Sequence, residues 1–341
     1  MASITQLRYR LDRAPITRDR VVTSARARWK RLASLISPEL AFLERNHDVR
    51  NALILASSAR SGSTWLAEVL VNPSDCRFIF EAFHYDNGGV FGQFTPGYYF
   101  GDRIDYAPLQ MLIGRVLSGR VRIRWSDRYN SSRRPSYRLL KEACVTNALP
   151  AIQTAFPDVP IIYLLRHPVA CAWSWTRLNW GSLGDYTRQE AMLDRYFASQ
   201  KDEVIRQAFI SNIYRWCLEN KLPLSRLPRG SVHVVFYEDL VEHRDREFAR
   251  IERFLGERSQ GRWRVWSPNL AAVDRPSATA YPSAGEEAMG GRDMSMRWTR
   301  QVQREWIVDG VETLRLFGLD WIYGEDPWPK VAADEVLSRA S

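Results

Sequence analysis

One short stretch, running from a buried strand through a tight turn into a helix, limits most strongly how this chain can fold. The apolar run Ala52 to Ala56 predicts a buried strand. Small polar residues follow around Arg60 and Gly62, and apolar residues then recur at helical spacing from Trp65. Such a turn aims free backbone N–H groups at one point, where the helix dipole adds positive potential. The stretch therefore predicts an anion-binding loop.

The side chains of the loop add donors of their own. Arg60 brings a permanent positive charge, and Ser61, Ser63 and Thr64 bring hydroxyl groups. The nucleotide triphosphatase pattern G-x-x-x-x-G-K-[ST] is absent, because its first Gly and its Lys are both missing. The dinucleotide pattern G-x-G-x-x-G fails too, since Gly62 is the single glycine of the turn. Taken alone, the stretch also fits an ordinary strand–turn–helix with a Ser-rich cap.

A second segment repeats the strand-to-helix pattern about a hundred residues later. The apolar run Ile161 to Leu165 predicts another buried strand, and Pro168 suits the first turn of a following helix. Arg166 is then expected at the carboxyl end of a strand, where ligands of open α/β sheets bind. Ser174 follows eight residues later, about two helical turns on. Arg166 and Ser174 are expected to hold one phosphate between them; alone, Arg166 also fits a helix-capping surface residue.

Together the two segments resemble the sulfotransferases that use 3'-phosphoadenosine 5'-phosphosulfate (PAPS), over roughly residues 50 to 320. The resemblance is closer to the carbohydrate and tyrosyl-protein branch than to the cytosolic small-molecule branch. It implies a P-loop-like α/β architecture, with PAPS as co-substrate and adenosine 3',5'-bisphosphate as product. The 3'-phosphate motif is matched by Arg166 and Ser174. The 5'-phosphosulfate loop is matched by Arg60, Ser61, Gly62, Ser63, Thr64 and Trp65.

Two further segments match the same family. In Ser231 to Leu240, a strand pattern ends in Tyr-Glu-Asp-Leu, and the resemblance places Tyr237 near the adenine. Without the resemblance, such an aromatic is more often part of the core. The amphipathic stretch Trp298 to Phe317 follows a Gly- and Arg-bearing loop, which in the family covers the 3'-phosphate. The resemblance adds Arg292, Arg297 and Trp298 as nucleotide-binding candidates, and leaves open which arginine meets the phosphate.

A hydroxyl acceptor needs a base, and two residues compete for that role. Glu81 ends an apolar segment whose flanks are expected to desolvate its carboxylate and raise its pKa. Carbohydrate and tyrosyl-protein sulfotransferases are similar here, with a Glu as base. His84 is the competitor, because an imidazole titrates near neutrality. Lys141 ends another apolar run, and similar lysines of the family reach the transferring sulfuryl group, although a surface lysine is the commoner case.

Sulfuryl transfer is expected to need no metal. As in phosphoryl transfer, catalysis consists mostly of positioning and of stabilising charge on the leaving oxygen. Arg60 and the loop N–H groups are expected where that charge develops. A sulfuryl group carries less charge than a phosphoryl group, and no acidic residue follows the Ile161 to Leu165 strand to hold magnesium.

The 341 residues, 45% of them hydrophobic, suffice for one large domain. Strands alternate with helical segments (148–155, 240–255 and 302–317), which predicts an α/β fold with a mostly parallel sheet and helices on both faces. We expect a basic extension at 1–36, a single catalytic domain at 37–330 and a tail at 331–341. Four cysteines without C-x-x-C spacing suit a reduced cytosol.

Charge is concentrated at the start of the chain. Residues 1–36 hold nine Lys or Arg against two Asp, which is +7 of the formal +9. Such an arm is able to bind nucleic acid, anionic lipid or an acidic glycan, or to remain a solvated extension. No signal peptide or apolar run of membrane-spanning length is present, so we expect a cytoplasmic enzyme, with peripheral membrane contact through the arm as an option.

The expected acceptor is a hydroxyl compound, carbohydrate or glycolipid, rather than nucleic acid. Aromatic residues at 83–125 and 173–196 suit a pocket mouth, with Trp175 and Trp180 in the second group, although such rings also cover sheet edges. Arginines between 103 and 124 suit an acidic acceptor. Two alternatives remain: a nucleotide kinase, which should show a loop Lys and an acidic metal ligand, and a non-catalytic glycan- or nucleic-acid-binding module. The oligomeric state is not predicted.

Overall fold

The computed structural model describes residues 41–84, 87, 105–180, 208–259 and 292–339. Its contacts divide the chain into Met1–Ala41 and Phe42–Ser341, and the second unit is described below. The basic extension at 1–36 lies outside the described residues. The predicted domain boundaries stay predictions, although Val336 and Leu337, within the expected tail, are buried in the hydrophobic core.

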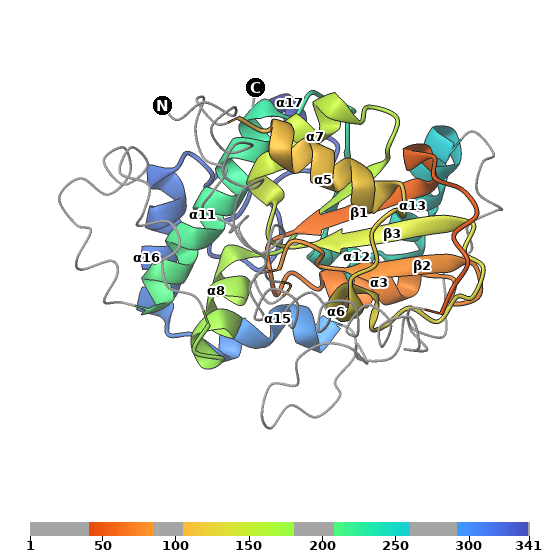
Figure 1. The fold of residues 1–341 in the computed structure, drawn as a ribbon. Helices are drawn as coiled ribbons and strands as arrows, with labels where there is room; N and C mark the ends of the chain where they lie inside the picture. The colour runs from red at the N-terminus through yellow and green to blue at the C-terminus, as the bar shows by residue number, and fades with distance from the viewer. Residues whose placement is uncertain (1–40, 85–86, 88–104, 181–207, 260–291, 340–341) are drawn as a thin grey trace, which may run out of the picture. The chain divides into compact units, whose positions relative to one another are not determined.

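A parallel sheet forms the centre of the described structure (Figure 1). Its five strands lie in the order β2-β3-β1-β4-β5, and every pair of neighbours runs parallel. Parallel strands place their carboxyl ends at one edge, and their continuous apolar runs are typical of strands covered on both faces. The strands are β1 (Ala52–Ser57), β2 (Cys76–Phe80), β3 (Tyr137–Glu142), β4 (Ile161–Leu165) and β5 (His233–Phe236).

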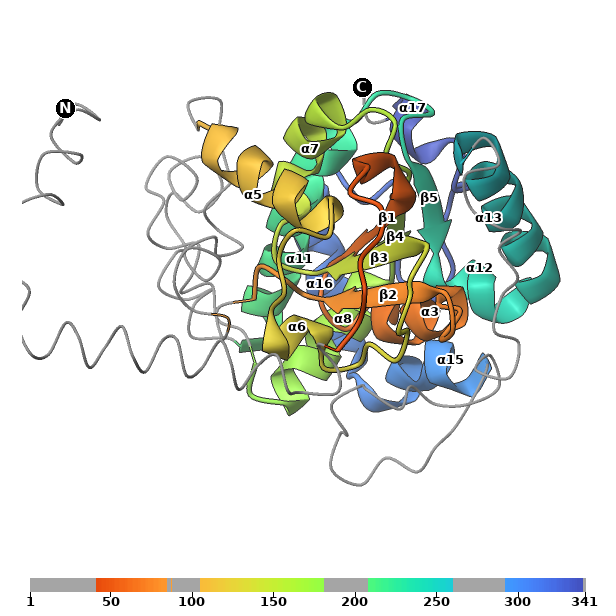
Figure 2. The ribbon, with the colours of Figure 1, turned by 45° about the vertical axis from the view of Figure 1, so that its right-hand side comes forward.

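Helices cover both faces of the sheet, as predicted (Figure 2). Alternate residues of β1 enter two separate cores: Leu53 and Leu55 one, and Ile54 the other. The first core is covered by α3 (Ser63–Leu70), α12 (Tyr237–Glu242) and α13 (Arg244–Ser259). The second is covered by α5 (Ala107–Leu117), α7 (Leu149–Ala155), α8 (Pro168–Arg177), α11 (Ala208–Arg226) and α16 (Arg304–Leu316).

The remaining elements are shorter or lie at the margins of the sheet. They are the 3-10 turns η2 (Val49–Asn51) and η5 (Thr146–Ala148), and the helices α6 (Arg124–Asp127), α15 (Arg292–Gln301) and α17 (Val336–Arg339). Within the described ranges, no helix has both the length and the apolar character needed to cross a membrane.

Three predicted elements need correction. The strand pattern ends at Phe236, and Tyr-Glu-Asp-Leu begins α12 instead of closing the strand. The predicted helix 240–255 is two helices, because the chain leaves helical geometry at His243, the C-cap of α12. The amphipathic stretch from Trp298 to Phe317 is likewise divided between α15 and α16, since Gln303 has the extended conformation of an N-cap. Apolar periodicity continues across such breaks and does not reveal them.

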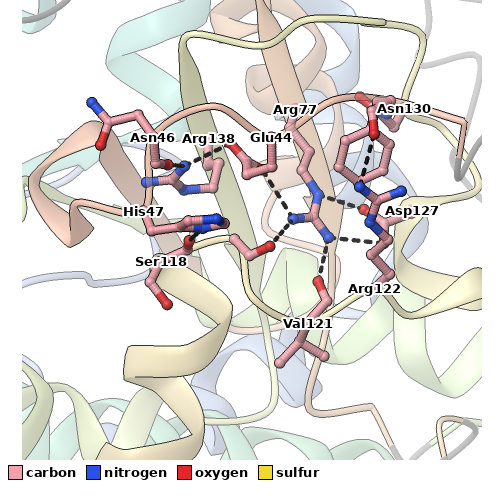
Figure 3. Close-up of polar contacts among 12 residues, drawn as sticks. Glu44, Asn46, His47, Arg77, Ser118, Val121, Arg122, Asp127, Asn130 and Arg138 are labelled. Carbon is pink, nitrogen blue, oxygen red and sulfur yellow. Dashed lines mark hydrogen bonds and ion pairs between the residues drawn. The ribbon is translucent and has the colours of Figure 1, made fainter.

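A buried charge network holds the opposite end of the sheet (Figure 3). Arg77 of β2 and Arg138 of β3 are register neighbours, and both are fully buried. Arg77 pairs with Asp127 at 2.8 Å and with Glu44 at 3.2 Å, and Glu44 also pairs with Arg138 at 2.8 Å. Two carboxylates thus balance two guanidinium groups, as buried charges require. Because Asp127 belongs to α6, the network fixes α6 against β2.

Candidate active site at the carboxyl ends of the strands

The first loop has the backbone conformation of an anion-binding turn. Arg60 has a φ of 62° and Gly62, the N-cap of α3, a φ of 87°. The N-cap residue Gly62 has no side chain with which to cap the first N–H groups of α3. A Cβ added to Gly62 would lie 2.5 Å from two ring atoms of Tyr237. Glycine is therefore required here both by the left-handed conformation and by the close ring.

The hydroxyl residues of this loop differ in exposure. Ser61 and Ser63 are buried, and Thr64 is half-buried. Ser61 Oγ lies 3.6 Å from Cys171 Sγ on α8, so the loop packs directly on that helix. Burial raises the pKa of the Cys171 thiol to about 12, which keeps it a neutral packing group.

The two predicted anion-binding segments meet. Strands β1 and β4 are neighbours, so the loops after them leave the same edge of the sheet. Nη1 of Arg166 donates to the backbone oxygen of Arg60 at 2.9 Å. Nε of Arg60 donates to Oγ of Ser174 at 2.9 Å. Two guanidinium groups and one hydroxyl therefore converge on one region. Ser174, which is predicted to share a phosphate with Arg166, accepts a hydrogen bond from Arg60.

Tyr237 lies against this cluster. It is the first residue of α12 and is buried, and its ring lies edge-on to Trp65 with the ring centres 6.1 Å apart. The guanidinium carbon of Arg166 lies 4.5 Å from the centre of the Tyr237 ring. Burial raises the pKa of the Tyr237 phenol, and the charge of Arg166 opposes that rise. Tyr237 is thus part of the wall that orients Arg166.

The third predicted nucleotide-binding segment is described in part. The loop before α15 and the side chain of Arg292 lie outside the described residues. Arg297 is half-buried on α15. Trp298 is buried and stacks on His167, with ring centres 4.3 Å apart. Trp298 therefore packs against the loop that follows β4, through His167, the residue next to Arg166.

Behind Arg166 lies a buried polar cluster that the sequence analysis missed. Glu238 accepts hydrogen bonds from the backbone N–H of His167 at 2.9 Å and from the hydroxyl of Tyr323 at 3.0 Å. Burial raises the pKa of Glu238 to about 7 and lowers that of His167 to about 3. The neutral ring of His167 caps α8 by accepting from Val169 N. His167 and Glu238 each lie two residues after the end of a buried strand, β4 and β5 respectively. This shared position of two polar residues was the available signal.

The candidate base and the candidate lysine form an ion pair. Glu81 directly follows β2, and Nζ of Lys141 on the neighbouring strand β3 donates to its carboxylate. Their side chains are 12% and 4% exposed, so the pair is largely removed from water. Glu81 has a φ of 42°, a conformation rare for a residue with a side chain. The sequence placed both residues at this edge but did not pair them.

The competing base, His84, closes the same turn. Its backbone N–H donates to the oxygen of Glu81 at 3.0 Å, and its ring stacks on Trp125 of α6 with centres 4.7 Å apart. Glu81 and His84 are both half-buried and lie in one turn. The geometry alone thus leaves both as base candidates.

The aromatic groups predicted at a pocket mouth separate into different roles. Most of the aromatic residues within 83–125 and 173–196 lie outside the described ranges. Trp175 is fully buried in the core, so its expected place in a pocket is wrong. Trp180 lies 5.9 Å from the guanidinium carbon of Arg60 and does belong to the site. Arg122 bonds to the backbone oxygen of Phe42, which gives it a structural contact.

A separate cavity of about 730 Å³ contains none of the predicted site residues. It lies beside α12 and α13, and charges that line it pair with acidic residues, Arg246 with Asp239 at 3.9 Å and Arg250 with Asp334 at 3.8 Å. We therefore place the candidate active site at the strand ends, where two arginines from separate loops converge.

Part of the chain matches a known protein family. The family model described as "Sulfotransferase family" matches residues 106–260. The matched segment contains Lys141, Arg166, Ser174 and Tyr237, whereas the loop with Arg60 precedes it. A search of curated proteins found no significant match.

Several solved structures are similar to this chain at low sequence identity. The sulfotransferase domain from the Synechococcus PCC 7002 olefin synthase is 17% identical, with a TM-score of 0.39, over 81% of this chain and 98% of that one. The sulfotransferase from Alicyclobacillus acidocaldarius is 14% identical, with a TM-score of 0.37, over 81% and 97%. A retinol dehydratase in complex with androsterone and the inactive cofactor PAP is 13% identical, with a TM-score of 0.36, over 84% of each chain.

Proposed function

We propose that this protein is a PAPS-dependent sulfotransferase that moves a sulfuryl group to a hydroxyl of an acceptor. One observation carries the proposal: Arg166 donates to the backbone oxygen of Arg60, and Arg60 in turn donates to the hydroxyl of Ser174, so two arginines from the ends of neighbouring strands lie in one region. Two guanidinium groups in one region suit a ligand that carries several negative charges, because guanidinium groups bind phosphate oxygens with charge-assisted hydrogen bonds. A nucleotide with phosphates on both sides of its ribose is such a ligand.

The residues suit the two ends of that nucleotide differently. The start of α3, whose N-cap is a glycine, and the hydroxyls of Ser63 and Thr64 suit the 5'-phosphosulfate. Arg166 and Ser174 suit the 3'-phosphate, with Arg292 or Arg297 as a further contact. Tyr237, fixed by Trp65 and Arg166, suits the adenine side. When bound, PAPS supplies the sulfuryl group, and the bond from sulfur to the 5'-phosphate oxygen breaks as the bond to the acceptor oxygen forms.

The residues of the chain then have separate tasks. Arg60 and the N–H groups of the loop stabilise the charge on the leaving phosphate oxygen. Lys141 stands beside the candidate base, so its ammonium reaches the region where the sulfuryl oxygens carry charge. Glu81, or His84 in its place, takes the proton of the acceptor hydroxyl. No step in this scheme needs a metal ion.

The acceptor is proposed to be carbohydrate-containing, either a free glycan or a glycolipid. Trp125, half-buried beside His84, supports an acceptor with an apolar face; its ring also contacts the guanidinium of Arg128, whose carbon lies 3.8 Å from the ring centre. Rings of this kind stack on the apolar faces of sugars. The basic segment 1–36 would bring the enzyme to anionic membranes if the acceptor is lipid-linked.

The decisive experiment incubates the full chain with sulfur-labelled PAPS and a panel of glycans, glycolipids and phenols. Mass spectrometry should find a sulfate added to at least one acceptor and adenosine 3',5'-bisphosphate in equal amount. A chain that consumes no PAPS with any acceptor, and does not bind adenosine 3',5'-bisphosphate, would contradict the proposal. If the chain binds the nucleotide but transfers no sulfuryl group to any member of the panel, the proposed acceptor class is wrong.

A further inference from the structure

A second buried carboxylate lies under the turn that carries both base candidates. Glu142 is the last residue of β3, next to Lys141, and is 1% exposed. Its Oε1 accepts a hydrogen bond from the backbone N–H of Phe83 at 3.2 Å. Among the described residues, its Oε2 is buried and has no hydrogen-bond partner. A buried oxygen without a partner holds a proton at far lower cost than a charge.

The turn above Glu142 is held in an unusual conformation. Glu81 has a positive φ, a conformation that is unfavourable for a residue with a side chain and persists only where the surroundings fix it. Three hydrogen bonds fix its backbone: Glu81 N to Lys141 O at 2.8 Å, His84 N to Glu81 O at 3.0 Å, and Asn87 Nδ2 to Glu81 O at 3.1 Å. The bond from Phe83 to Glu142 ties the middle of this turn to β3. The positions of Glu81 and His84 therefore depend on the carboxyl of Glu142.

We propose that Glu142 is a positioning residue of the proposed sulfuryl transfer: its neutral carboxyl holds the 81–84 turn and keeps the Glu81–Lys141 ion pair free of a second negative charge. This inference rests on the proposed function for its catalytic meaning. Its structural part, the tie between Glu142 and the turn, stands without it.

The charges around Glu142 support the neutral form. Burial and, second, the charge of Glu81 raise the pKa of Glu142 to about 8, against the opposing N–H groups of Phe83 and Ala82 and the ammonium of Lys141. The groups that face it are Glu81 from the end of β2, Lys141 on β3 and the thiol of Cys144, and beyond Cys144 lies Arg215 on α11. When Glu142 is neutral, the negative charge of Glu81 and the positive charge of Lys141 cancel. With Glu142 ionised, one negative charge is left where an anionic nucleotide must bind.

Substitutions of Glu142 distinguish the effect of its hydrogen bond to Phe83 from the effect of its charge. Glu142→Gln keeps an oxygen for the N–H of Phe83 and cannot ionise, whereas Glu142→Ala loses the tie. Hydrogen exchange of the peptide that contains residues 78–84 should rise at least tenfold in Glu142→Ala and stay within about twofold of wild type in Glu142→Gln. Glu247→Gln, a buried carboxylate on α13, is the matched control and should leave this exchange unchanged.

A pH profile tests the charge. Glu142 keeps its proton to a higher pH in the folded than in the unfolded chain, so its stabilising contribution is complete below about pH 4.5 and is lost as the pH rises through about 8. The free energy of unfolding of wild type should therefore fall between pH 5 and 9 relative to Glu142→Gln. Under the proposed function, kcat of wild type should also fall roughly tenfold from pH 7 to 9, as the neutral fraction does, while Glu142→Gln keeps its rate.

The outcomes are distinguishable. Equal pH dependence of unfolding in wild type and Glu142→Gln, or unchanged exchange in Glu142→Ala, overturns the role of Glu142. If Glu142→Ala fails to fold, the comparison of wild type with Glu142→Gln decides alone. Loss of PAPS turnover in every protein, with the exchange and unfolding results as expected, would instead refute the sulfotransferase function and leave the structural tie in place.

Discussion

Nε of Arg60 donates a 2.9 Å hydrogen bond to the hydroxyl of Ser174, a residue 114 positions later in the chain. The contact joins the loop after β1 to α8, which follows the neighbouring strand β4. It places a permanent cation between the two predicted phosphate sites. Under the proposed function, a nucleoside with phosphates at both ends binds across this contact.

The first prediction concerns the nucleotide. Adenosine 3',5'-bisphosphate should raise the melting temperature of the wild-type chain, and adenosine monophosphate should raise it much less, because only the former offers a 3'-phosphate. Arg166→Ala should weaken binding of the bisphosphate roughly 10- to 100-fold, since a hydrogen bond to a charged group contributes about 1.5–3 kcal/mol. A thermal unfolding assay measures the shift of the melting temperature, and titration calorimetry measures the affinity. Arg115→Ala, an exposed arginine on α5, is the control, and equal shifts by the two nucleotides would argue against a 3'-phosphate site.

The second prediction concerns the turn at Gly62. Alanine at a left-handed position costs about 1–2 kcal/mol, and at Gly62 its Cβ would also meet the buried ring of Tyr237. Gly230→Ala is the matched control, because its φ is 72° and nothing lies within 4 Å of the added Cβ. Urea unfolding should show Gly62→Ala at least about 1 kcal/mol less stable than Gly230→Ala. Equal losses would mean that Tyr237 is not packed against the turn.

The third prediction assigns the base. Glu81→Gln should lower kcat at least about 100-fold, because a carboxamide cannot accept the proton, and should leave the affinity for adenosine 3',5'-bisphosphate nearly unchanged. Steady-state kinetics and calorimetry separate the two effects. His84→Asn should give a much smaller loss. A nearly normal rate in Glu81→Gln, together with a large loss in His84→Asn, would move the base to His84.

The fourth prediction concerns metal ions. Sulfuryl transfer by arginine and backbone N–H groups should be unaffected by a chelator such as EDTA. Rates measured before and after chelation, and after restoring magnesium, provide the check. A large loss that magnesium restores would favour the nucleotide kinase alternative.

The fifth prediction is a pH dependence of stability from His167. Burial lowers the pKa of His167 to about 3, so its folded form stays neutral while the unfolded chain takes up a proton below about pH 6.5. The stabilising contribution is therefore present above pH 6.5 and is lost as the pH falls toward 3. His167→Asn keeps a capping oxygen for α8 and removes the titration. Its free energy of unfolding, measured from pH 7 to 5, should decrease less than that of wild type, and parallel curves would contradict the prediction.

The sequence alone determined the strands, the edge of the sheet at which the chemistry gathers and most residues of the candidate site. Leu53 to Leu55 and Ile161 to Leu165 are continuous apolar runs, and the polar residues that follow each run must lie at the carboxyl ends. These are local properties, because periodicity and turn residues act through near neighbours. The break at His243 and the helical start at Tyr237 were misjudged, since an apolar pattern continues through both.

Only the tertiary structure decided which side chains meet. Lys141 pairs with Glu81, Ser174 accepts a hydrogen bond from Arg60, and Glu238 supports the loop of His167. Each of these contacts joins residues that are far apart in the chain, and each depends on the strand order and register that bring the loops together. Composition carries no information on that register, because many orders of the same strands bury equal apolar area. The buried partners, Glu142 and Glu238, become visible only once the strands are placed.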